Sequence, residues 1–161
     1  MTWPAMAVGL AAIIAGAVFD MKTMEVPLYV FPPAIALSIL LVYKGLGPVW
    51  YAESLISGVT VLVWMGLVCS VTYLVRRRLE GEDAQAPLGG ADLMCSALCC
   101  FIFGASGIAV TFFAFILCLP IVLKKHREND RSPYPLIPAY LPPYIILMLL
   151  HLLPSGSLTQ I

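Results

Sequence analysis

Six apolar runs make up most of this chain, and only short polar or small-residue breaks separate them. The runs cover residues 3–19, 28–43, 50–75, 93–103, 108–123 and 134–153. Of the 161 residues, 61% are hydrophobic and 11% are charged, whereas a soluble domain is about 45–50% apolar and about 25% charged. The sequence therefore predicts a single all-α domain over residues 1–161, a polytopic membrane bundle of about six transmembrane helices.

Two of the runs are short. The fourth and fifth hold about 12 and about 16 residues, whereas crossing a hydrocarbon core of about 30 Å takes about 20 residues. Either the bilayer thins locally or interfacial residues complete these helices, and a re-entrant pair is the alternative. The first run lacks the preceding basic segment of a signal peptide, so we expect residues 3–19 to form a membrane helix.

The basic residues predict the orientation. If the N-terminus and the C-terminus both lie outside the cytoplasm, only Lys44 is external. The cytoplasmic segments then hold the other eight: Lys22, Arg76, Arg77, Arg78, Lys124, Lys125, Arg127 and Arg131. This is a strong positive-inside bias, and the aromatic residues Trp3, Tyr43, Trp50 and Tyr51 fall at the outer interface, where an aromatic belt is expected. The net charge of zero gives no sign of a nucleic-acid partner, and we expect none.

The cysteines are predicted to be small buried hydrophobic residues. All five lie in apolar runs and no two form a C-x-x-C pair: Cys69, Cys95, Cys99, Cys100 and Cys118. This spacing disfavours a zinc ribbon. We expect neither a metal ion nor a cofactor.

Two aspartates are the candidate catalytic residues. The predicted topology puts Asp20 at the inner end of the first helix and Asp92 at the inner end of the fourth, 72 positions later. Asp20 lies where the helix dipole disfavours negative charge, and acidic groups near the hydrocarbon boundary are functional candidates. Asp92, taken alone, suits an N-cap. Gly89 and Gly90 precede it and give the backbone freedom to bend and to admit another chain.

Two carboxyl groups that share a site favour acid–base chemistry. They do not easily both ionise, so one stays protonated while the other acts as the base. The base activates a water that attacks a peptide carbonyl, and the acid hydrogen-bonds the carbonyl oxygen and helps to protonate the leaving amine. The pair titrates as a unit, so neither role is assigned to one residue.

Three short motifs resemble those of type IV prepilin peptidases, which are membrane aspartic proteases. Asp20 followed by Val26-Pro27 resembles the first aspartate motif, and Gly89-Gly90-Ala91-Asp92 resembles the second, Gly-x-Gly-Asp. The segment 137–140, Ile-Pro-Ala-Tyr, resembles the one that opens the family's last helix, with Pro138 as its proline. Ala91 stands in place of a glycine, and Met94 and Leu28 stand where the family often has a lysine and a polar residue.

The resemblance covers nearly the whole chain and implies a function. It implies an endopeptidase of the inner membrane that cleaves the basic leader from prepilin-like substrates at the cytoplasmic face. The chain lacks the cysteine-bearing segment of the bifunctional enzymes, so the resemblance implies cleavage without methyl transfer, as in the short enzymes of Tad-type pili or archaeal filaments. The lipid bilayer is an expected partner, and a homo-oligomer is compatible with the small residues in the helices.

Other interpretations remain open. Gly104-Ala-Ser106-Gly107 with His151 resembles the serine and histidine of rhomboid proteases, in which a histidine activates the serine. A carrier that relays protons through Asp20 and Asp92, an assembly subunit or an inactive peptidase homologue is a further alternative. The acidic residues Glu80, Glu82 and Asp83 would either attract a basic leader or form a solvated loop.

Overall fold

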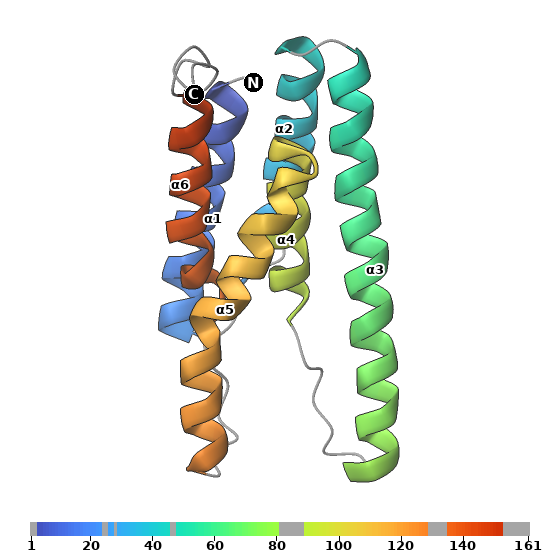
Figure 1. Ribbon diagram of the computed structural model, residues 1–161, viewed down its shortest axis with the longest axis vertical. Helices are drawn as coiled ribbons and strands as arrows, with labels where there is room; N and C mark the ends of the chain where they lie inside the picture. The colour runs from blue at the N-terminus through green and yellow to red at the C-terminus, as the bar shows by residue number, and fades with distance from the viewer. Residues whose placement is uncertain are drawn as a thin grey trace, which may run out of the picture.

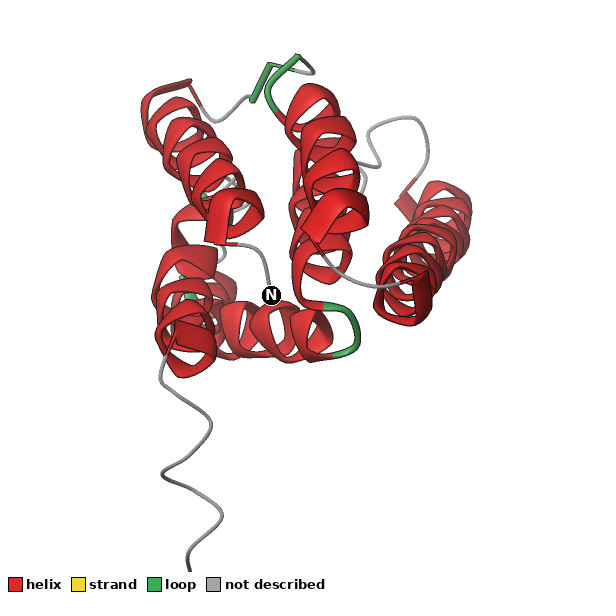
Figure 2. Ribbon diagram, turned by 90° about the horizontal axis from the view of Figure 1, so that it is seen from above, coloured by secondary structure: helices red, strands yellow, loops and turns green. Residues whose placement is uncertain are grey.

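The computed structural model describes residues 3–23, 26–27, 29–45, 48–80, 89–128 and 135–152. Within these ranges the regular elements are helices, without a strand (Figure 2). They are α1 (Trp3–Thr23), α2 (Phe31–Gly45), α3 (Pro48–Glu80), α4 (Gly90–Phe103), α5 (Ser106–Arg127), the 3₁₀ helix η2 (Ile137–Tyr140) and α6 (Leu141–Leu152). The helical bundle predicted from the apolar runs is confirmed.

Three of the described helices are long and apolar enough to cross a membrane. The qualifying stretches are Trp3–Thr23, Tyr51–Val75 and Ser106–Lys125. Only 6% of the stretch in α3 is buried inside the bundle, and large side chains such as Val63 and Trp64 are exposed. Soluble proteins rarely expose contiguous apolar surface of this extent, so these helices indicate a membrane protein.

Helix α4 is the centre of the bundle. It packs against α1, α2, α3 and α5, and every residue from Cys95 to Phe103 is buried. Glycines allow the neighbouring helices to approach: a β-carbon on Gly9 of α1 would overlap Ile102, and one on Gly58 of α3 would overlap Phe101. Helix α3 packs mainly on α4 and stands at the edge of the bundle (Figures 1 and 2).

The two ends of the bundle differ in composition. Helices α1, α3 and α5 end on the same side (Figure 1), which gathers the basic residues Lys22, Arg77, Arg78, Lys124, Lys125 and Arg127 there. At the opposite side, Trp3 is exposed, and the rings of Tyr43 and Tyr51 meet edge to face with centroids 5.1 Å apart. This separation agrees with the predicted orientation, which itself stays a prediction.

Several helix bounds differ from the predicted ones. Helix α1 continues past Asp20 to Thr23, whose hydroxyl donates to the Phe19 carbonyl over 2.9 Å. Helix α5 has 22 residues, with Pro120 inside it, so it is longer than the predicted fifth helix and long enough to span alone. Helix α4 remains short, with 14 residues. The predicted bounds failed where a charged residue was taken as a helix end, whereas the small-residue break after Phe103 is found as the turn between α4 and α5.

The prediction for the cysteines is confirmed for four of them. Cys95, Cys99, Cys100 and Cys118 are buried, whereas Cys69 on the peripheral helix α3 is partly exposed. All five are free thiols.

Candidate active site

The Asp20 carboxyl group is buried in the last turn of α1. Its residue is 8% exposed, and the backbone N–H of Ile137 donates to Oδ2 over 2.9 Å. The amide of Leu136 lies beside the same carboxyl group. These amides compensate for a position where the dipole of α1 disfavours negative charge. The start of η2, 117 positions away, therefore holds the first candidate catalytic residue.

The Asp92 carboxyl group lies at the start of α4. Its Oδ2 accepts a hydrogen bond from the Gly89 N–H over 3.1 Å. The prediction that Asp92 is the N-cap is wrong, because Gly89 is the N-cap and Asp92 is the third helical residue. Gly89 has no side chain that could accept a hydrogen bond from the backbone N–H of Asp92, so the Asp92 side chain alone caps this end of the helix. Negative charge is favoured at a helix N-terminus.

The fold brings the two aspartates together. Asp20 and Asp92 come from different helices, and their carboxyl groups lie within electrostatic range of each other. Helices α1 and α4 are in contact. The two candidate residues are thus carried by contacting helices, and their shared catalytic role stays a prediction.

Neighbouring helices contribute three cysteine thiols near Asp92. Cys69 on α3, Cys95 on α4 and Cys118 on α5 all lie within electrostatic range of Asp92. A thiol is uncharged at neutral pH at its ordinary pKa, so these neighbours bring no counter-charge. Within the described ranges, no group of three His, Cys, Asp or Glu residues comes together for a metal ion.

The pair lies inward of the basic ends of the long helices. Cys69 precedes the end of the apolar stretch at Val75 by six residues, and Cys118 precedes Lys124 by six. At about 1.5 Å per residue, α3 rises about 9 Å from Cys69 to Val75, and α5 rises about 9 Å from Cys118 to Lys124. Figure 1 shows both helices continuing past the level where α1 ends and α4 begins. The end of α1 and the start of α4, which carry the aspartates, are therefore not level with the outermost polar ends of α3 and α5 (Figure 1).

A short chain of hydrogen bonds joins Asp92 to the same segment that holds Asp20. The Ser96 hydroxyl donates to the Asp92 carbonyl over 2.9 Å, and its Oγ lies 2.7 Å from the hydroxyl of Tyr140. Tyr140 is the last residue of η2, whose first residue, Ile137, binds Asp20. Ser96 was not among the candidate residues. Its spacing of four residues from Asp92 puts it on the same helix face, but a serine in an apolar run reveals no partner.

The motif glycines act differently from the prediction. Gly89 has φ −71° and ψ 151°, which any residue can adopt, and Gly104 is the one described glycine with positive φ. A β-carbon on Gly89 would lie 3.2 Å from Oδ2 of Asp92, whereas one on Gly90 would meet open space. Gly89 therefore provides room for the carboxyl group, and the structure gives no steric reason for Gly90.

The motif prolines both lie in turns. The Pro27 carbonyl accepts from the Val30 N–H over 3.1 Å in the turn before α2. Pro138 lies in the first turn of η2, where no intrahelical partner for an N–H exists, and its carbonyl accepts from the Leu141 N–H. Pro138 thus fits the start of the segment whose Ile137 amide holds Asp20.

The residues of the serine-protease alternative are not linked. Ser106 is exposed at the first position of α5. The Nδ1 atom of His151 lies 2.8 Å from the Leu147 carbonyl, and its ring lies against Phe103 with centroids 5.5 Å apart. In the described part of the chain, no hydrogen bond joins Ser106 to His151. Of the acidic cluster, Glu82 and Asp83 and the side chain of Glu80 lie outside the described residues.

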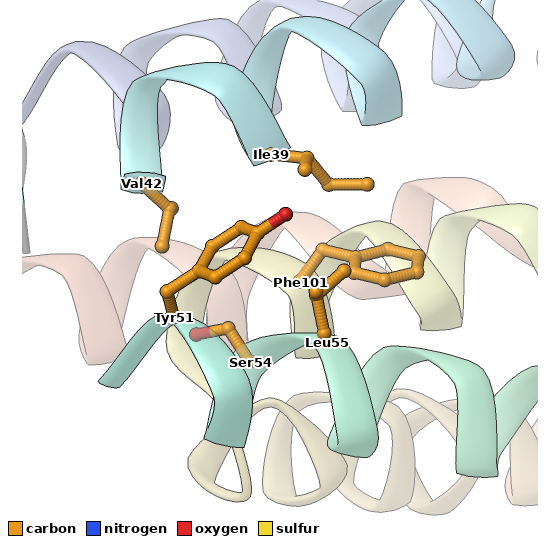
Figure 3. A pocket seen from close by; sticks show the side chains of 6 residues that line it. All are labelled: Ile39, Val42, Tyr51, Ser54, Leu55 and Phe101. Atoms are coloured by element: carbon orange, nitrogen blue, oxygen red, sulfur yellow. The ribbon is translucent and has the colours of Figure 1, made fainter. Parts of the chain in front are cut away.

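A small hollow lies elsewhere, between α2, α3 and α4 (Figure 3). Its lining is mostly apolar and comprises Ile39, Val42, Tyr51, Ser54, Leu55 and Phe101. The Tyr51 ring extends from the first part of α3 toward α2. The lining holds no carboxyl group and so offers no acid–base pair.

No family model, curated protein or solved structure matches the chain, so the site is interpreted from its own residues.

Proposed function

We propose that this protein is an aspartic endopeptidase of the inner membrane that removes the basic leader from type IV prepilin-like substrates. One observation carries the proposal: Asp20 and Asp92, far apart in sequence, lie on contacting helices and are both linked by hydrogen bonds to segment 137–140, Asp20 directly and Asp92 through Ser96. The charge of Asp20 also acts on the Asp92 carboxyl group. The three segments of the sequence resemblance therefore meet at one location.

The chemistry of the pair suits peptide hydrolysis. Two neighbouring carboxyl groups share one proton, since a second negative charge is disfavoured beside the first. The ionised group takes a proton from water as the water oxygen bonds to the peptide carbonyl carbon. The protonated group hydrogen-bonds the carbonyl oxygen, and a proton then passes to the nitrogen as the C–N bond breaks. Water and peptide give a carboxylic acid and an amine.

The proposed topology gives this site access to a leader peptide. Six helices cross the membrane, both termini lie outside the cytoplasm, and the basic ends of α1, α3 and α5 face the cytoplasm. A prepilin has its basic leader at that face and its apolar helix in the bilayer. Cleavage without methyl transfer follows from the family resemblance alone.

The test is co-expression with a candidate prepilin, followed by leader removal on a gel. We expect Asp20→Asn and Asp92→Asn each to abolish cleavage, because an amide cannot accept or share the proton. Ser106→Ala is the matched control and should cleave like the wild type. Cleavage that persists in the double aspartate variant would refute the proposal, and loss with Ser106→Ala alone would favour the serine mechanism.

A further inference from the structure

The hydrogen bond between Tyr140 and Ser96 has a defined direction. Both residues are 0% exposed, and their hydroxyl oxygens are 2.7 Å apart. A serine hydroxyl has one proton, and that of Ser96 is donated to the Asp92 carbonyl. The Tyr140 hydroxyl is therefore the donor to Ser96. A buried hydroxyl group without a hydrogen-bond partner is unfavourable, so this hydrogen bond is maintained in the folded state.

The two ends of η2 contact the two halves of the site. Its first residue, Ile137, holds the Asp20 carboxyl group through its N–H, and its last residue, Tyr140, contacts α4 through Ser96, one turn from Asp92. A 3₁₀ helix rises about 2 Å per residue, so these two attachment points are separated by about 6 Å along a single stiff turn.

We propose that Tyr140 and Ser96 are positioning residues that set the separation of the Asp20 and Asp92 carboxyl groups. The inference rests on the proposed peptidase function and adds the element that fixes the geometry of the pair. Without the Tyr140 hydroxyl, the hydrogen-bonded link between η2 and α4 is lost, and only helix packing holds the start of α4 in register with Asp20. A displacement of about 1 Å at a catalytic group can lower a rate by about 100-fold.

The pH profile distinguishes positioning from a general loss of stability. The active pair holds one proton, and the neighbouring charge makes that proton harder to remove. If the two carboxyl groups move apart, the proton that they share is lost at lower pH. The alkaline limb of the pH–rate profile then moves to lower pH. The other titratable groups near the pair are Lys22 on α1, Cys69 on α3, Cys95 on α4, Cys118 on α5 and Tyr140 itself. At their ordinary pKa values, the thiols and the tyrosine hydroxyl do not titrate between pH 4 and about pH 7.

Tyr140→Phe is the principal variant, because it leaves the Ser96 hydroxyl bonded to the Asp92 carbonyl. Ser96→Ala is the second variant. Tyr144→Phe is the matched control: Tyr144 is also 0% exposed, and its hydroxyl donates to the Met6 carbonyl over 2.8 Å, without a link to either aspartate. All are purified in detergent, checked by thermal unfolding and assayed for prepilin cleavage across pH.

We expect Tyr140→Phe to lower kcat by about tenfold or more with little change in KM, and to move the alkaline limb to lower pH. Ser96→Ala should do the same, and the double variant should be no worse than the single ones. Tyr144→Phe should keep the wild-type profile even if its unfolding temperature falls. An unchanged profile in Tyr140→Phe, beside an aspartate-dependent wild type, overturns this inference alone. Cleavage that does not require the aspartates overturns it together with the proposed function.

Discussion

At the residue scale, Gly89 and Gly90 differ in what they do for Asp92. Gly89→Ala would set a methyl group 3.2 Å from the carboxyl oxygen that caps α4. We expect the carboxyl group to shift and prepilin cleavage to fall by about tenfold. Gly90→Ala meets open space and should raise thermal stability slightly, because alanine favours a helix by about 1 kcal/mol over glycine. Equal cleavage by the two variants, measured under the same conditions, would contradict this role of Gly89.

The sequence predicts the site residues only in part. Asp20 and Asp92 stand out because a carboxyl group beside an apolar run is costly in a membrane. The partners of Asp20 are backbone amides of residues 136 and 137. Backbone amides are common to nearly all residue types, so the sequence does not reveal these partners. Ser96 is an ordinary residue in an apolar run, and Tyr140 stands out only as part of segment 137–140. Their contact depends on how η2 packs beside α4, so the residues alone do not predict it.

At the element scale, close packing of α4 and α5 depends on Gly107. A β-carbon there would lie 2.5 Å from the backbone carbonyl of Cys99, and a helix backbone cannot move aside locally. We expect Gly107→Ala to lower the free energy of unfolding by about 1–3 kcal/mol, as overpacking does. The matched control is Gly66→Ala on α3, where the added methyl group meets no neighbour. Thermal unfolding in one detergent compares the two variants, and equal stability would show that the helices can separate without loss.

The existence and order of the helices were predictable, but their ends were less so. Six apolar runs gave six helices, and Pro32 and Pro33 lie in the first turn of α2, where prolines are tolerated. Asp20 was taken as the end of the first helix because it is charged, yet α1 continues to Thr23. Tertiary hydrogen bonds make a charged residue acceptable inside the last turn, and a local pattern contains no information about them.

At the scale of the whole molecule, the long helices α3 and α5 extend past the helix ends that carry the aspartates. Helix α3 stands at the edge of the bundle (Figure 2), and both α3 and α5 extend past the start of α4 (Figure 1). An apolar environment of low dielectric strengthens the interaction between two neighbouring carboxyl groups. The run lengths and the basic residues predict which helix ends lie on the same side of the bundle. The level of the two aspartates depends instead on where the short helix α4 begins, which is short of the ends of α3 and α5 (Figure 1).

The central claim is that Asp20 and Asp92 act as one catalytic unit. The most direct test is the rate of prepilin cleavage by purified protein with Asp20→Asn, with Asp92→Asn and with both changes. Residues that act together are not additive, so each single variant should lose at least about 10³-fold and the double variant should lose no more. Two partial losses that multiply in the double variant, or substantial activity in either single one, would contradict the account.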